Sequence, residues 1–154
     1  MTAIGDPVED ESRPEPPEPS EPPRILLDTN VVIMRPDRAK LTALGPARLM
    51  VAAITYAELA EGEFAADPAA RLRAPLDLLL ARQAYGPGLP FDDSAAQVYP
   101  AICRAVIQSG RALGRARRID MMIAAIALAN GCGLATRNTD DFSPLSTVLT
   151  LIDL

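Results

Sequence analysis

The chain takes its architecture from one segment, Arg24-Ile25-Leu26-Leu27-Asp28-Thr29-Asn30-Val31-Val32-Ile33. Three apolar residues lead directly into a carboxylate, a hydroxyl and an amide, which predicts a buried strand at 25–27 with Asp28 at its carboxyl end. In open α/β sheets this edge binds ligands, because the connecting loops diverge there. Alternatively, Asp28 or Thr29 simply caps the short helix that follows, and this segment alone does not separate the two explanations.

Composition restricts the chemistry. The 154 residues are enough for one domain, and 49% apolar residues can fill its core. Aromatic residues make up only 4%, which argues against a base-stacking platform. The chain has no His and two cysteines, Cys103 and Cys132, which excludes a Cys/His zinc site and a His-based triad. Any bound metal must be held by oxygen, which favours Mg²⁺ or Mn²⁺.

Charge and proline are concentrated at the N-terminus. Residues 1–23 hold seven of the 20 acidic residues and seven of the 15 prolines, whereas the remainder is near neutral. Such a segment buries too little apolar surface to fold, so we expect a disordered tail at 1–23 and one domain at 24–154. We see neither a basic-then-apolar leader nor an apolar run of about 18 residues, so we expect a cytoplasmic protein.

Apolar periodicity predicts alternating strands and helices. Strands are expected at 25–27, 49–53, 132–136 and 148–152, with a possible short one at 89–91. Helices are expected at 29–35, 37–44, from 55, at 69–84, at 92–108 and at 120–130, where Gly131 ends the last one. Leu72, Leu76, Leu79 and Leu80 form either a core face or a dimerisation face. The alternation predicts an α/β/α sandwich around a mostly parallel sheet of four or five strands.

Four carboxylates stand where strands end or helices begin: Asp28, Glu58, Asp120 and Asp141. Each has a local explanation. Glu58 completes a capping box with Thr55, Asp120 suits the first turn of a helix, and Asp141, like Asp140, suits a turn.

These four positions share a property that the local explanations do not predict. In a parallel sheet the junctions that carry Asp28, Glu58 and Asp141 lie on one edge, and we expect the N-terminus of the Asp120 helix to meet the same cleft. Clustered carboxylates repel one another unless a cation is bound. Carboxylates, waters and substrate phosphates are the usual ligands of Mg²⁺. Such a site can make hydroxide from water and stabilise a displacement at phosphorus.

Four segments resemble, in order, the motifs of the PIN-domain ribonucleases, and most closely those of the VapC toxins of type II toxin–antitoxin systems. The first is Leu26-Leu27-Asp28-Thr29-Asn30-Val31, and the second is Ile54-Thr55-Tyr56-Ala57-Glu58-Leu59 with Gly62. The third comprises Gly110-Arg111, Ile119-Asp120 and Ile123-Ala124-Ala125. The fourth comprises Leu134-Ala135-Thr136-Arg137-Asn138 and Asp141-Phe142.

The resemblance implies a PIN-like fold and a metal-dependent endoribonuclease that uses Mg²⁺ or Mn²⁺. By it, Asp28, Glu58, Asp120 and Asp141 match the catalytic and metal-binding acids, although either Asn138 or Asp141 completes the site and Asp140 is a weaker candidate. Thr29, Asn30, Thr136 and Asn138 match residues that orient these acids by hydrogen bonds. It also implies 5′-phosphate and 3′-hydroxyl products, an RNA substrate such as tRNA, rRNA or another structured RNA, a homodimer, and a VapB-like antitoxin.

Two other function classes remain open. A phosphohydrolase of the haloacid-dehalogenase type needs a second acid two residues after Asp28, but Asn30 is there. A non-catalytic RNA- or protein-binding module would not need acids at all four positions. If RNA is bound, the arginines leading into Asp120 are the best phosphate ligands, although each also suits a solvated surface turn: Arg111, Arg115, Arg117 and Arg118.

Overall fold

The computed structural model describes residues 21–154, and residues 1–20 of the predicted tail lie outside the described part. Four strands, β1 (Arg24–Leu27), β2 (Arg48–Val51), β3 (Gly133–Thr136) and β4 (Leu151–Asp153), form one sheet in the order β2-β1-β3-β4. All three pairings are parallel. The α/β class and the parallel sheet are therefore confirmed, with four strands.

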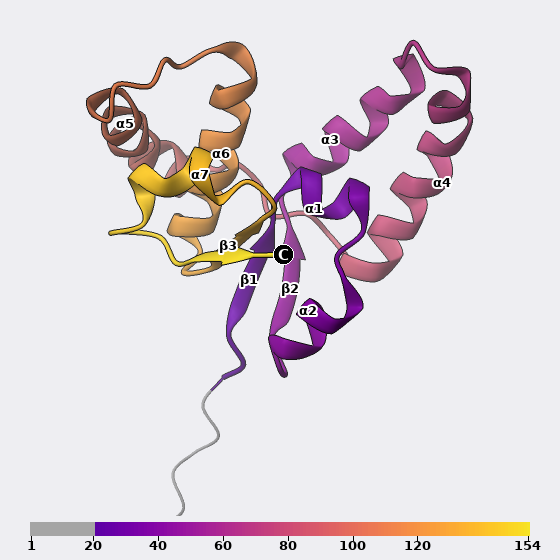
Figure 1. Cartoon of the computed structure of the whole chain (residues 1–154), viewed down its shortest axis with the longest axis horizontal. Helices are drawn as coiled ribbons and strands as arrows, with labels where there is room; N and C mark the ends of the chain where they lie inside the picture. The colour runs from indigo at the N-terminus through magenta and orange to yellow at the C-terminus, as the bar shows by residue number, and fades with distance from the viewer. Residues whose placement is uncertain (1–20) are drawn as a thin grey trace, which may run out of the picture.

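Helices cover both faces of this sheet (Figure 1). Leu26 of β1 packs on the side of α5 (Asp93–Gln108) and α6 (Arg115–Ala129). Its neighbours Ile25 and Leu27 pack on the side of α1 (Thr29–Met34), α3 (Ala53–Glu61) and α4 (Pro68–Tyr85). Successive strand side chains point to opposite faces, so a strand covered on both sides must be apolar throughout.

Local signals set several element ends. The Asp92 side chain accepts a 3.1 Å hydrogen bond from the Ala95 amide and begins α5. Gly131, at φ +63°, follows α6 as predicted. Gly88 lies so close to α3 that a Cβ there would stand 2.6 Å from the Ala53 nitrogen. This close approach lets the Ala53 amide donate to the Leu89 carbonyl at 2.8 Å, which fixes where α3 begins.

The structure corrects two predicted helix starts. The α3 helix begins at Ala53 without a side-chain cap, so the capping box proposed for Thr55 and Glu58 is wrong. The α6 helix begins at Arg115, because its arginines and Ala116 are good helix formers, so Asp120 lies in the second turn and not the first.

Three smaller corrections concern other segments. Residues 89–91 form only an isolated bridge between Leu89 and Ala52. The predicted turn at 137–142 contains a short helix, α7 (Thr139–Phe142), and the last strand begins at Leu151 rather than Val148. The remaining short elements are α2 (Arg38–Ala43) and the 3₁₀ turns η1 (Gly62–Phe64) and η2 (Ser143–Leu145).

The leucine stripe of α4 does not belong to the core. Leu72 is 84% exposed and Leu76 is 56% exposed, and Leu79 and Leu80 are exposed at 53% and 41%. The core-face explanation is therefore wrong, and the dimerisation face stays a prediction. No helix in residues 21–154 is long and apolar enough to cross a membrane.

Candidate active site

Asp28 is held rigidly at the carboxyl end of β1. It is only 3% exposed. Its Oδ1 accepts a hydrogen bond from the Thr29 amide at 2.8 Å, and its Oδ2 accepts one from the Thr136 hydroxyl at the end of β3, also at 2.8 Å. Asp28 is thus both the cap of α1 and a member of the acidic site. Burial raises the pKa of Asp28, while the bonds from Thr136 and Thr29 lower it.

Glu58 reaches the same edge from α3. Its Oε2 accepts a short hydrogen bond from the Thr29 hydroxyl, which also lies 3.1 Å from the buried Thr55 hydroxyl. Burial raises the pKa of Glu58, the Thr29 bond opposes this, and the negative charge of Asp28 adds to it. Thr55 therefore supports the site through Thr29. The sequence had predicted only a helix cap at this position.

Asp120 carries the strongest perturbation. Burial, followed by the charges of Asp28, Glu58 and Asp141, raises the pKa of Asp120 to about 6, and Arg117 opposes the shift. Within residues 21–154, its carboxylate accepts no side-chain hydrogen bond from the protein. An acid that is repelled by three others and accepts no side-chain hydrogen bond identifies a region of concentrated negative charge.

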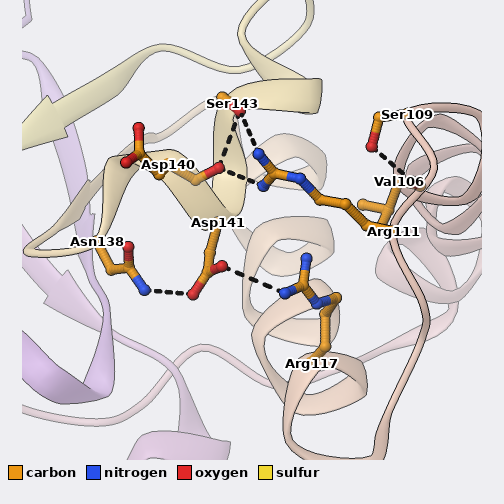
Figure 2. A network of polar contacts seen from close by, with 8 residues as sticks. All are labelled: Val106, Ser109, Arg111, Arg117, Asn138, Asp140, Asp141 and Ser143. Atoms are coloured by element: carbon orange, nitrogen blue, oxygen red, sulfur yellow. Dashed lines mark hydrogen bonds and ion pairs between the residues drawn. The ribbon is translucent and has the colours of Figure 1, made fainter.

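Asp141 lies at the edge of this group, on α7 (Figure 2). Its Oδ1 is 3.3 Å from Arg117 Nη2, and its Oδ2 accepts a short hydrogen bond from Asn138 Nδ2. The negative charge of Asp141 helps to raise the pKa of Asp28 and of Asp120, so Asp141 repels both of these acids. In Figure 2 the carboxylate of Asp140 points away from Arg117.

Asn30 and Asn138 form hydrogen bonds that connect the loop after β3 to the site. Asn30 Nδ2 is 3.4 Å from the Thr136 hydroxyl, and its Oδ1 accepts from the Arg137 amide at 3.3 Å. The Asn138 amide also donates to the Thr136 hydroxyl, at 3.1 Å. The four predicted orienting residues, Thr29, Asn30, Thr136 and Asn138, therefore all contact the acids or one another.

The four arginines divide into two pairs. Arg111 donates to the Asp140 carbonyl and to the Ser143 hydroxyl, and Arg117 pairs with Asp141, so both hold the α7 segment (Figure 2). Arg115 and Arg118 are exposed on α6. A role in RNA binding stays a prediction for all four.

The donor set fits a hard divalent cation, because every candidate ligand is a carboxylate oxygen and the group is mutually repulsive. Even so, no three acids or cysteines among residues 21–154 are arranged so that they could hold a metal ion as they stand. The hydrogen bonds explain this: Glu58 is directed at Thr29, and Asp141 at Arg117 and Asn138.

Comparison with known proteins identifies the family of the chain. The model of the PIN domain family matches residues 25–146, which include all four acids. The chain belongs to the PIN domain family. It is 37% identical to a VapC ribonuclease of Sinorhizobium fredii over 129 residues, which cover 77% of this chain and 89% of that protein.

Solved structures of toxin–antitoxin proteins have a fold similar to that of this PIN domain. A member of the VapBC family from Mycobacterium tuberculosis superposes with a TM-score of 0.70 at 28% identity, covering 86% of this chain and all of that one. VapBC2 from Rickettsia felis, bound to a DNA fragment from its promoter, superposes at 0.69 with 21% identity, over 85% and 98% of the two chains. The fold expected from the resemblance is thereby confirmed.

Proposed function

We propose that this PIN domain protein is a metal-dependent endoribonuclease and the toxin of a toxin–antitoxin pair. The proposal rests on one observation: Asp28, Glu58, Asp120 and Asp141 gather at the carboxyl edge of the sheet, where their repulsion and burial raise the pKa of Asp120 to about 6. The similarity to a VapC ribonuclease supports RNA as the substrate. A tRNA, an rRNA or another structured RNA would fit.

The four acids would hold Mg²⁺, with Mn²⁺ as the alternative, because their oxygens suit hard cations. When bound, the cation supplies an activated water and neutralises charge that builds up on the phosphate. Asp28 is oriented by hydrogen bonds from Thr29 and Thr136, and Glu58 accepts one from the Thr29 hydroxyl. Asp120, whose pKa is raised to about 6 by burial and by the neighbouring acids, can hold a proton at the reacting centre.

A cleavage assay tests this function directly. Purified full-length protein should cut RNA with Mg²⁺ or Mn²⁺ and lose that activity in excess EDTA. Asp28→Asn, Asp120→Asn and Glu58→Gln should remain folded and lose cleavage. Glu63→Gln, which changes an exposed glutamate of η1, is the matched control and should cut normally. Full activity in EDTA, or RNA binding without cleavage by the wild type, would favour a non-catalytic module.

The partners we propose are a VapB-like antitoxin and a second copy of this chain. The known VapBC structures with the same fold support the first. Apolar side chains left in solvent support both: a groove of about 410 Å³ between α1 and α4 is lined by residues such as Val32, Leu59 and Leu80. Ile33, which also lines the groove, is 59% exposed, and Leu72, nearer the start of α4, is 84% exposed. Exposed apolar surface of this kind often marks a protein interface.

Sedimentation distinguishes the homodimer from the monomer. The wild type should sediment as a dimer, and Leu72→Glu combined with Leu76→Glu should shift it to a monomer without changing its melting temperature, because both side chains are already exposed. A wild-type monomer would leave the apolar surface to the antitoxin alone.

A further inference from the structure

Arg117 is the only basic side chain in residues 21–154 that forms an ion pair with one of the four acids. Its Nη2 lies 3.3 Å from Oδ1 of Asp141, and its side chain is 26% exposed. Its Nη1 is buried and has no hydrogen-bond partner. Arg117 also stands one helical turn before Asp120 on α6, and its positive charge lowers the pKa of Asp120.

This ion pair determines where Asp141 is directed. One carboxylate oxygen accepts from Arg117 and the other from Asn138, so both face donors of the chain itself. A divalent cation bound to Asp141 in this position would stand close to a guanidinium, and like charges a few ångströms apart repel strongly in a partly buried site. The pairing therefore keeps the Asp141 carboxylate directed at groups of the chain itself.

We propose that Arg117 is a positioning residue that, through its ion pair with Asp141, competes with the divalent cation for this acid and weakens metal binding. The inference rests on the proposed metal-dependent function and deepens it. Metal binding then requires the Arg117–Asp141 pair to open. Because coupling between two binding events is reciprocal, a bound cation also weakens the hold of Arg117 on α7.

The test is calorimetric titration of the full chain with Mn²⁺ in the absence of RNA. Arg117→Gln and Arg117→Met should each bind Mn²⁺ at least about fivefold more tightly than the wild type, the lower end of typical coupling between sites. Methionine keeps the apolar stem and so protects the packing if glutamine does not fold. Arg118→Gln is the matched control: it removes the same charge from the next, exposed position of α6 and should leave the affinity nearly unchanged.

A double-mutant cycle shows whether the effect acts through Asp141. In an Asp141→Asn background, the gain from Arg117→Gln should disappear, because the pair is already broken. Unchanged affinity in both Arg117 variants, or a gain that persists with Asp141→Asn, would overturn the inference while leaving the proposed function intact. A wild type that binds no Mn²⁺ would overturn both.

Discussion

The Thr136 hydroxyl donates a 2.8 Å hydrogen bond to Oδ2 of Asp28, and so joins residues 108 positions apart at the ends of two adjacent parallel strands. The same hydroxyl accepts from the Asn138 amide at 3.1 Å. One buried oxygen thereby orients the central acid and fixes the start of the loop that carries Asp141. The edge of the sheet is organised around this contact.

Replacing Thr136 with Val should weaken the fold. Valine has nearly the same shape but leaves Oδ2 of the buried Asp28 carboxylate without its donor, while Oδ1 keeps the Thr29 amide. An unpaired buried acceptor typically costs about 1–3 kcal/mol of unfolding free energy. Thr42→Val is the control, because the Thr42 hydroxyl bonds Arg38 on the exposed surface of α2. Chemical denaturation measures both variants. Equal losses at the two positions would mean that the Asp28 contact contributes nothing special.

The raised pKa of Asp120 predicts an unusual pH dependence of the unfolding free energy when a chelator keeps the protein free of metal. The folded protein keeps this proton up to about pH 6, whereas the unfolded chain releases it near 3.8. The unfolded state therefore binds fewer protons in this window, and stability falls as the pH rises from 3.8 to about 6.

Asp120→Asn should remove this fall, because asparagine does not titrate. At neutral pH without metal the variant should be more stable than the wild type by about 1–2 kcal/mol, a figure reduced for solvent screening of a half-exposed group. Urea melts at several pH values measure the difference. A variant that is less stable than the wild type would indicate that Asp120 makes a structural contact.

Gly88→Ala should destabilise the protein and displace the start of α3. The new Cβ would meet the backbone of Ala53 at 2.6 Å, and backbone cannot move aside as a flexible side chain can. Overpacking of this kind costs about 1–3 kcal/mol. Gly114→Ala is the comparison, since a Cβ there meets nothing within 4 Å at a φ of −69°. A similarly small loss in both would show that the α3 start is tolerant.

Replacing Arg115 and Arg118 together with Ala should weaken RNA binding and reduce its salt dependence. Each lost phosphate contact should lower the log–log slope by about 0.7–0.9. Affinity is measured across a salt series in EDTA, where cleavage is not expected. Arg104→Ala, which removes an exposed charge from α5, should leave the slope unchanged. An unaltered slope in the double variant would place the RNA path on another surface.

Local sequence determined the strand at 25–27 and the order of strands and helices. It also determined the Asp92 cap and the end of α6 at Gly131. These features follow from short-range apolar runs, side-chain caps and backbone preference. The meeting of Asp28, Glu58 and Asp141 at one edge also follows from sequence, because parallel strands place their carboxyl ends there, whereas Asp120 comes from the second turn of α6.

Only the tertiary structure decided how these residues are used. Thr55 and Glu58 have the spacing of a capping box, yet both turn to the Thr29 hydroxyl, a partner 26 and 29 positions away. Local sequence predicts that Arg117 is a surface charge, but the fold brings Asp141 of α7 within 3.3 Å of it. A polar side chain takes the partner that folding brings closest, and sequence spacing reports only partners within a few residues along the chain.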